Sequence, residues 1–269
     1  MPQTKRFSLM LDALTELAAE EKTQNATSSD SVQDRHATTL PSLREVISSA
    51  GPLPGEALFL GLAEDGLTVL LNLYDPVPGP LLITGDSSSG KTALLQVIAR
   101  AIELMHSPAE VEFAVMTVSP NDWNELSESQ NLAGIYSTQD NTVKDLLYSL
   151  VSWAHNNKGD KQSVVLMIDD LESATKLSDE AEQNLRWLLL RGPSRRVWPI
   201  ITLNASQAKN LKPWLGFFRT RLFGHIENTD DAEMVTGLSD SPFNYLIAGS
   251  QFTMREGKNW LNFWIPKLD

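Results

Sequence analysis

Eight consecutive residues, Gly85 to Thr92, have the types and spacing needed to hold phosphate groups. They read GDSSSGKT and match the pattern Gly-x-x-x-x-Gly-Lys-Ser/Thr at every fixed position. Glycines allow a loop to turn its backbone N–H groups inward, where they form a nest for phosphate oxygens, and a following helix adds its own unpaired N–H groups. The predicted phosphate-binding residues are Gly85, Asp86, Ser87, Ser88, Ser89, Gly90, Lys91 and Thr92.

Two side chains at the end of this loop are predicted to act on phosphate and metal. Lys91 is expected to reach the β- and γ-phosphates of a nucleotide, and the Thr92 hydroxyl is expected to ligate Mg²⁺. The alternative is a chance turn of glycine and serine. The flanking sequence argues against it, because an apolar LLIT precedes the loop and helix-forming residues follow it. We therefore predict that the chain binds a nucleotide.

Adjacent acids later in the chain could complete a magnesium site. The segment VVLMIDDLES places Asp169 and Asp170 directly after five apolar residues, at the carboxyl end of a predicted buried strand, where α/β proteins bind ligands. Asp169 is the predicted Mg²⁺ partner, directly or through water, and Asp170 or Glu172 is predicted to polarise the attacking water. The alternative is that these acids only end the strand.

A polar residue at another strand end and several arginines are further candidates. Asn204 ends the segment IITLN and is suited to sensing a γ-phosphate, although asparagine at a strand end is also typical of a turn. An arginine supplied by a neighbouring subunit can stabilise transition-state charge, whereas most surface arginines are structural or solvated. The arginine candidates are Arg195, Arg196, Arg219 and Arg221.

The elements around these residues alternate between strands and helices. Nearly continuous apolar strands separated by helices predict an α/β fold with a mainly parallel sheet covered by helices on both faces. Two hairpins at the edges of the sheet are also expected, around Asp65-Gly66 and Glu256-Gly257, as is a short helix over 41–49. The predicted strands are 81–84, 111–118, 163–170, 197–204 and 220–226, and the predicted helices are 91–105, 142–155 and 179–191.

Composition excludes several classes of protein. The chain of 269 residues has no cysteine, so disulfides and thiolate metal sites are excluded. No apolar run is long enough for a transmembrane helix or a signal peptide, and a cytoplasmic location is expected. The net charge of −12 makes the chain a poor general binder of polyanions, so a DNA contact would require a local basic surface, such as one lining the pore of an oligomer.

The first forty residues differ from the rest of the chain. Residues 7–21 have apolar positions at roughly helical spacing, and residues 22–39 are polar without aromatic residues, which is typical of a flexible linker. The predicted helix either docks a partner or is a frayed terminal segment. We therefore expect an N-terminal helix and linker over 1–40 and a main domain over 41–269.

Residues 55–266 resemble the FtsK/HerA superfamily of RecA-like P-loop ATPases. The phosphate loop is the specific motif, and the order and spacing of the other segments support it. These segments are the early hairpin LFLGLAEDGLTVLLNL, the passage SPAEVEF after the first helix, the acidic VVLMIDDLES, RTRLFGHIENTDDAEMVTG, and the late LIAGSQFTM. In this resemblance Lys91, Thr92, Asp169 and Asp170 take the nucleotide roles, and Arg221 matches the arginine of the family's "TRI" segment.

The resemblance implies a RecA-like core, ATP with Mg²⁺ as cofactors, a ring that is usually a hexamer and, most often, translocation of double-stranded DNA. Some relatives move proteins instead. This chain departs from the family pattern at three places. Ser119 and Asn121 replace an acid and a lysine, Asn204 stands where a Thr-Gln pair is usual, and Asp170 stands where glutamate is commoner.

Three hypotheses for the function follow. The first is an ATP-hydrolysing ring motor of the DNA-translocase type. The second is a nucleotide-gated assembly or regulatory subunit with weak hydrolysis and no DNA binding. The third is an ATPase that energises protein transport through a partner bound to the N-terminal helix.

Overall fold

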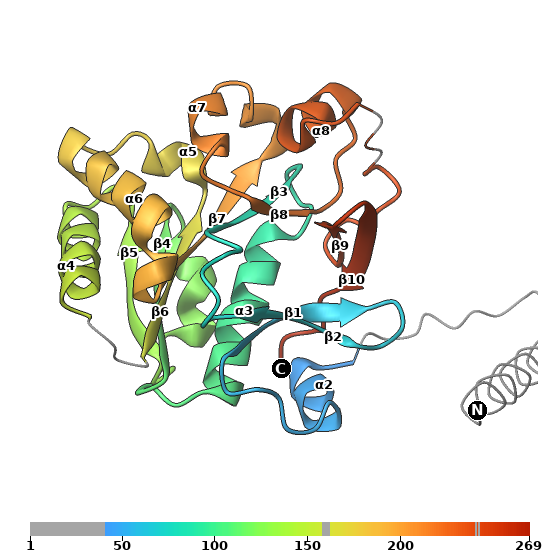
Figure 1. Ribbon diagram of the computed structural model, residues 1–269, viewed down its shortest axis with the longest axis horizontal. Helices are drawn as coiled ribbons and strands as arrows, with labels where there is room; N and C mark the ends of the chain where they lie inside the picture. Colours follow the sequence, from blue (N-terminus) through green and yellow to red (C-terminus); the bar gives the residue numbers. More distant parts are fainter. Residues whose placement is uncertain (1–40, 158–161, 240, 242) are drawn as a thin grey trace, which may run out of the picture. The chain divides into compact units, whose positions relative to one another are not determined.

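The computed structural model describes residues 41–157, 162–239, 241 and 243–269 (Figure 1). The helix predicted over 7–21 and the polar linker predicted over 22–39 lie outside these described residues. The description below concerns the domain that begins at Pro41.

The described residues form a ten-stranded sheet in the order β2-β1-β10-β9-β8-β3-β7-β6-β4-β5. The half of the sheet from β8 to β5 pairs in parallel, as the apolar strands predict. Its strands are β8 (Thr220–Phe223), β3 (Leu81–Gly85), β7 (Val197–Asn204), β6 (Ser163–Asp169), β4 (Val111–Thr117) and β5 (Leu132–Ser137).

Two antiparallel hairpins extend the sheet beyond β8. The hairpin β1–β2 turns at Gly66, whose φ of +83° suits glycine, and the hairpin β9–β10 turns at Gly257 with a φ of +62°. Only β1–β2 lies at the edge of the sheet. The second hairpin, expected at an edge, lies inside the sheet because β9 pairs with β8 and β10 pairs with β1. The bounds are β1 Ala57–Ala63, β2 Thr68–Asn72, β9 Gln251–Glu256 and β10 Asn259–Trp264.

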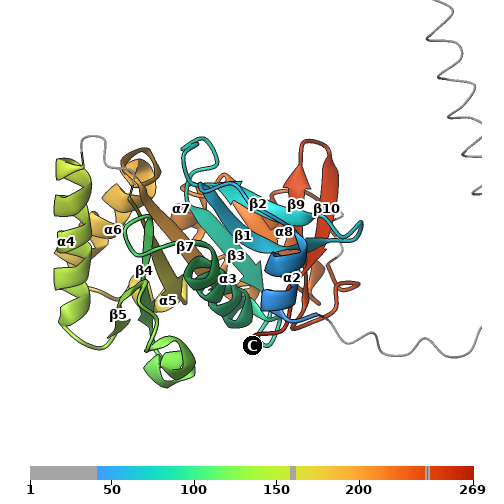
Figure 2. The ribbon, with the colours of Figure 1, turned by 90° about the horizontal axis from the view of Figure 1, so that it is seen from below.

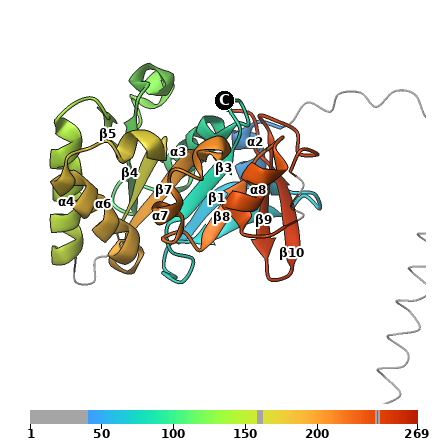
Figure 3. The ribbon, with the colours of Figure 1, turned by 90° about the horizontal axis from the view of Figure 1, so that it is seen from above.

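Helices cover both faces of the sheet, as Figures 2 and 3 show from opposite sides. Successive side chains of a strand point to opposite faces, so Leu82 packs in one hydrophobic core while Leu81 and Ile83 pack in the other. Core residues from α2 (Leu43–Ser49), α3 (Lys91–Met105) and η1 (Pro120–Leu126) join the core of Leu81. The core of Leu82 receives α4 (Thr142–Asn156), α5 (Leu171–Ala174), α6 (Asp179–Arg191), α7 (Lys212–Leu215) and α8 (Thr229–Thr236).

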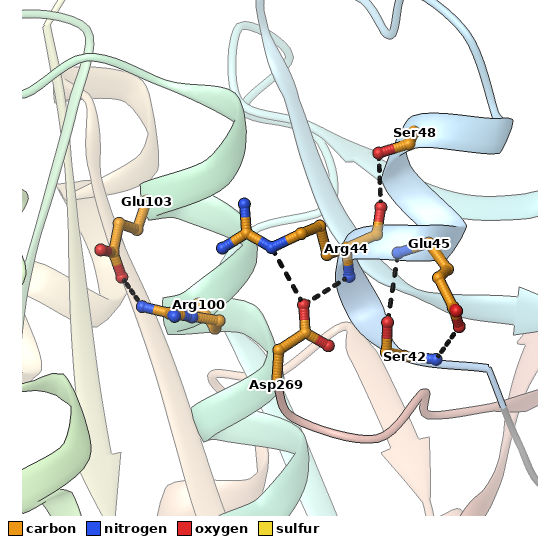
Figure 4. Close-up of polar contacts among 7 residues, drawn as sticks. All are labelled: Ser42, Arg44, Glu45, Ser48, Arg100, Glu103 and Asp269. Atoms are coloured by element: carbon orange, nitrogen blue, oxygen red, sulfur yellow. Dashed lines mark hydrogen bonds and ion pairs between the residues drawn. The ribbon is translucent and has the colours of Figure 1, made fainter.

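Local sequence explains where several helices begin. Ser42 and Glu45 form a reciprocal capping box at the start of α2, and the carboxylate of Asp269 accepts a hydrogen bond of 3.0 Å from the backbone N–H of Arg44 (Figure 4). Ser178 caps α6 by accepting from the backbone N–H of Ala181, as its position predicts. The short turns η2 (Pro193–Arg195) and η3 (Ala205–Gln207) flank β7.

Two strands of the parallel part of the sheet differ from the sequence prediction. Strand β5 was not predicted, because LAGIYS is only partly buried at the sheet edge and has no continuous apolar run. Strand β8 ends at Phe223 instead of residue 226, and the backbone N–H of Gly224 then donates to the Thr84 carbonyl over 2.8 Å. The chain after β8 therefore follows the start of the phosphate loop.

Candidate functional site

The order of the strands brings the predicted site residues together at the carboxyl ends of the parallel strands. Strand β7 lies between β3 and β6, and all three run parallel, so their carboxyl ends meet. Gly85 at the end of β3 lies opposite Asn204 at the end of β7, and Asp169 ends the next strand, β6. The loop after β3 and the acids after β6 thus face one region, although 77 residues separate Thr92 from Asp169.

The two glycines of the loop are required by its packing. Gly90 has a φ of +93°, and a Cβ there would lie 2.8 Å from the Cα of Gly249. A Cβ on Gly85 would lie 2.4 Å from the Ser89 Oγ. Ser88 also has a positive φ, at +65°, which is rare for a residue with a side chain. The backbone therefore has the left-handed turns that direct successive N–H groups into a concave nest.

Thr92, at the second position of α3, lies against the carboxylate of Asp169. Its Oγ1 is 2.9 Å from Asp169 Oδ2 and 3.1 Å from Oδ1. Mg²⁺ binds oxygen ligands at about 2.0–2.1 Å in octahedral geometry, which places neighbouring ligand oxygens about 2.9 Å apart. The hydroxyl and the carboxylate therefore fit two adjacent positions around Mg²⁺.

Asp169 is a partly buried acid held by two hydroxyl groups. The Thr202 Oγ1, from β7, donates to Asp169 Oδ1 over 2.9 Å and accepts from the backbone N–H of Asp170 over 2.8 Å. Burial raises the pKa of Asp169, while the hydrogen bonds from Thr92 and Thr202 and the charge of Lys91 oppose that rise. A divalent cation at this carboxylate would favour its ionised form.

The Lys91 ammonium lies over the backbone of the phosphate loop. Its Nζ donates to the carbonyl oxygens of Asp86 and Gly85, over 2.6 and 3.1 Å. Burial lowers the pKa of Lys91, and the charges of Asp169, Asp86 and Asp170 act in the opposite direction. A partly buried cation surrounded by carbonyls and acids is suited to binding an incoming anion.

The next two acids have partners of their own. The Asp170 carboxylate accepts from the backbone N–H groups of Glu172 and Ser173 and so caps α5. Asp170 has a φ of +97°, a conformation that costs energy for any residue other than glycine. Glu172 pairs with Lys176 over 2.7 Å on the exposed side of α5. The structure places Asp170 close enough to Lys91 for their charges to interact.

Asn204 lies beside the loop, as its strand end predicts. Its Nδ2 donates to the Ser87 Oγ over 3.1 Å, and its Oδ1 accepts from the backbone N–H and the hydroxyl of Ser206. The side chain therefore links the end of β7 to the middle of the phosphate loop, and it also has the turn-forming contacts that the alternative interpretation describes.

Arg221 lies away from this edge, near the amino end of β8. Its guanidinium donates to the backbone carbonyls of Leu215 at 2.7 Å, Phe218 at 3.1 Å, and Val235. Burial lowers the pKa of this guanidinium. Its donors thus join β8 to the C-terminal part of α8 and to the segment around α7. Arg219, two residues earlier, is exposed.

Sequence reasoning missed two segments that contact the loop. The backbone N–H of Asp86 donates to the carbonyl of His225 over 2.9 Å, and the Asp86 carboxylate accepts from the backbone N–H of Glu227 over 2.8 Å. The turn around Gly249 lies against Gly90. Only the glycines Gly224 and Gly249 in these segments could have indicated a close approach of backbones.

No model of a known protein family matches this chain, and no curated protein matches it either. Solved structures do. EccC of Thermomonospora curvata (ATPases 2 and 3), in complex with a signal sequence peptide, matches 86% of this chain and 43% of its own at 16% identity, with a TM-score of 0.67. EssC of Geobacillus thermodenitrificans (ATPases 2 and 3) matches 88% of this chain and 48% of its own at 11% identity, with a TM-score of 0.70.

A third similar structure is the pCW3 conjugation coupling protein TcpA with ATPγS, which matches 86% of this chain and 71% of its own at 13% identity, with a TM-score of 0.62. This chain shares the fold of these ATPase structures. The similarity confirms the α/β, RecA-like fold class predicted from the sequence. The chain spans less than half the length of the EccC and EssC structures.

One further expectation concerns membranes. Among the residues that the structure describes, none of the helices is both long and apolar enough to cross a bilayer.

Proposed function

We propose that residues 41–269 form a domain that binds ATP with Mg²⁺ and hydrolyses it. The observation that carries this proposal is the contact between Thr92 and Asp169, which joins the phosphate loop to the acidic strand end at 2.9 Å. A phosphate loop alone indicates only anion binding. A hydroxyl and a carboxylate at the spacing of two magnesium ligands indicate a nucleotide site that can support phosphoryl transfer.

Each residue of the loop has a distinct role in this proposal. The backbone N–H groups from Gly85 to Gly90 and the amino end of α3 receive the phosphate oxygens. The Lys91 ammonium exchanges the loop carbonyls for oxygens of the β- and γ-phosphates. Thr92 and Asp169 would hold Mg²⁺, and the bound ion would supply positive charge that stabilises phosphoryl transfer.

We propose Asp170, rather than Glu172, as the residue that polarises the attacking water. Asp170 directly follows Asp169 and interacts electrostatically with Lys91, whereas Glu172 faces Lys176 on the exposed side of α5. Two backbone N–H groups bind the Asp170 carboxylate and hold it at the start of α5. Asp170 stands where glutamate is commoner in the family that the sequence resembles, and its side chain is shorter, so we expect slow intrinsic turnover. Asp170→Asn should reduce hydrolysis far more than Glu172→Gln, and the reverse order would contradict this assignment.

Asn204 is proposed to sense the γ-phosphate through its contact with the loop at Ser87. The surroundings of Arg221 support a different role from the arginine finger that the resemblance suggests. Its guanidinium is bound to three backbone carbonyls of its own chain, so we propose that it stabilises the fold. The exposed Arg219 is then the better candidate for action in a neighbouring subunit of a ring, for which we keep the expectation of a hexamer.

The test of ATP hydrolysis also addresses the substrate that the motor moves. Phosphate release is measured with and without duplex DNA at low salt, using Lys91→Ala as the inactive control. A motor of the DNA-translocase type predicts stimulation by DNA. Turnover that DNA leaves unchanged, without detectable DNA binding, would exclude DNA as the substrate and leave the ATPase proposal intact.

A second candidate function, action on a protein partner, is favoured by a cavity of about 750 Å³ remote from the phosphate loop. Its lining is mainly apolar and basic, with one acid, Asp75. It includes Val77 from the segment after β2, Arg219 just before β8, Arg255 from β9 and Trp260 from β10. Such a mixture suits a peptide with apolar and acidic residues better than a duplex. Stimulation of hydrolysis by an acidic, apolar peptide, lost in Trp260→Ser, would support this candidate over DNA.

A further inference from the structure

The turn that precedes β9 forms one wall beside the phosphate loop. Its Gly249 lies so close to Gly90 that a Cβ on Gly90 would be 2.8 Å from the Gly249 Cα. Gly90 directly precedes α3, the helix whose amino end receives the phosphates in the proposed function. Within this turn, Ile247 has a relative exposure of 55%, which is high for a large apolar side chain.

Several hydrogen bonds hold Ile247 in a fixed position. The Gln251 side chain accepts from the backbone N–H of Ile247 over 3.1 Å, and the Ile247 carbonyl accepts from the backbone N–H of Gln251 over 2.9 Å. The preceding residue, Leu246, is buried at 2% exposure. The turn is therefore anchored on both sides of the exposed isoleucine.

His225 connects this turn to the phosphate loop. Its ring Nδ1 is 2.9 Å from the Leu246 carbonyl, and its own carbonyl accepts from the backbone N–H of Asp86 over 2.9 Å. The turn and the loop thus share one anchoring residue in addition to the contact between Gly249 and Gly90. This double connection fixes the position of Ile247 relative to bound phosphates.

We propose that Ile247 forms the subsite for the base of the nucleotide. This inference rests on the proposed function, because it assumes that phosphates bind at the loop. The backbone N–H groups of such a loop cradle the α- and β-phosphates, so the nucleoside is attached beside the loop, and the turn of Gly249 is a segment in contact with that loop. A flat base that covers Ile247 removes apolar surface from water on both partners.

The chemistry of the subsite predicts its selectivity. An aliphatic side chain contacts the face of a base and does not read the hydrogen-bonding groups on its edge. The subsite is therefore a purine site that accepts adenine and guanine with similar affinity, within about threefold, and binds the smaller pyrimidines more weakly. The preorganised turn means that binding requires little ordering of the protein.

The test compares ligands that share phosphates but differ in the base. The full chain with Mg²⁺ is titrated calorimetrically with ATP, GTP and inorganic tripolyphosphate. We expect Ile247→Ser to weaken ATP and GTP binding about tenfold and to leave tripolyphosphate binding unchanged. Ile247→Leu should restore most of the affinity. Leu67→Ser is the matched control, since Leu67 has an exposure of 67% in the turn of the β1–β2 hairpin.

The outcomes separate this inference from the proposed function. If Ile247→Ser weakens neither nucleotide, or weakens tripolyphosphate as much as ATP, the base subsite is overturned and the phosphate site stands. If Lys91→Ala binds ATP and tripolyphosphate as tightly as the unmodified chain, the phosphate site of the proposed function is contradicted, whatever the result at Ile247. A preference for ATP over GTP greater than tenfold would also contradict a subsite that contacts only the face of the base.

Discussion

Two partly buried cations, Lys91 and Arg221, lie at opposite ends of the parallel strands and have different partners. Burial lowers the pKa of both. Arg221 donates to three backbone carbonyls in two segments of the chain, and these bonds stabilise the fold. Lys91 donates to carbonyls of its own loop and lies in the field of Asp169 and Asp86.

This comparison shows how one physical feature, a desolvated positive charge, serves two purposes. At Arg221 the desolvation cost is offset by partners within the fold, so the residue is expected to contribute to stability. At Lys91 the partners within the fold offset only part of the desolvation cost, and a bound anion would offset the rest. Lys91 is therefore expected to contribute to binding and turnover. The predictions below test this distinction.

The largest expected effect is on turnover at Lys91. Lys91→Ala should reduce ATP hydrolysis about a thousandfold, because the cation that balances the γ-phosphate charge is removed. The thermal midpoint without ligand should stay the same or rise, since a desolvated charge is also removed. Phosphate-release assays and thermal denaturation measure both quantities. A clearly lowered midpoint would show that Lys91 is mainly structural.

Arg221 should give the opposite pattern. Arg221→Met should destabilise the domain by about 3 kcal/mol, because backbone carbonyls that accept from a charged donor lose their partner. Urea denaturation measures this change. Arg219→Met, two residues away on the surface, is the matched control and should alter stability by less than about 0.5 kcal/mol. Equal stabilities for the two variants would contradict the structural role of Arg221.

The Asp169 carboxylate is expected to be needed for hydrolysis and to lower the stability of the ligand-free domain. Asp169→Asn keeps the shape of the side chain but removes a metal-binding carboxylate, so hydrolysis should fall about a hundredfold. The ligand-free domain should at the same time melt about 2 °C higher, because burial raises the pKa of Asp169 and thus disfavours its ionised form. Scanning calorimetry and a hydrolysis assay on the same preparation test both parts. A lower melting temperature of Asp169→Asn would show that the Asp169 carboxylate stabilises the ligand-free domain, which contradicts this prediction.

Substitution of Asn204 should have a moderate effect on turnover and almost none on ATP affinity. Asn204→Ala breaks the 3.1 Å contact with Ser87, and the proposed γ-phosphate sensor is lost with it. We expect about a tenfold fall in the rate of hydrolysis with ATP affinity nearly unchanged. Calorimetric binding and steady-state kinetics separate the two. A matching loss of ATP and ADP affinity would instead indicate a role in shaping the loop.

The smallest expected effect is the pH dependence of stability. The folded pKa of Asp169 is raised above its unfolded value, so its favourable contribution is present below that unfolded value of about 4 and is lost as pH rises through the folded pKa. The stability of the unmodified chain, relative to Asp169→Asn, should therefore decline as pH rises from about 4. Denaturant titrations at a series of pH values measure this difference. A difference that grows with pH would mean that the pKa of Asp169 is lowered.

Much of the domain could be predicted from local patterns. The apolar run and polar loop around Gly85 predict a strand and a phosphate nest, and the capping position of Ser178 predicts the start of α6. These features depend on neighbouring residues, because backbone conformation and side-chain periodicity are set over a few positions. The α/β class with a mainly parallel sheet followed from the order of such elements, and the RecA-like core was implied by the family resemblance.

Local sequence patterns did not predict two features. These are the partly exposed strand β5 and the contacts of Asp86 with the chain after β8. Strand β5 is defined by its pairing with β4 at the sheet edge, which a short polar segment does not reveal. The bonds from Asp86 to His225 and Glu227 join residues that are far apart in the sequence. Spacing carries no information on such pairs, since they depend on which strands become neighbours.

The sequence by itself determined the residue types that can hold phosphate and metal, and the strand ends at which they stand. Only the tertiary structure decided that β7 separates β3 from β6, that Thr92 lies 2.9 Å from Asp169, and that Arg221 is bound within its own chain. The physical reason is that local conformation depends on adjacent residues, whereas the meeting of distant side chains depends on sheet order and packing.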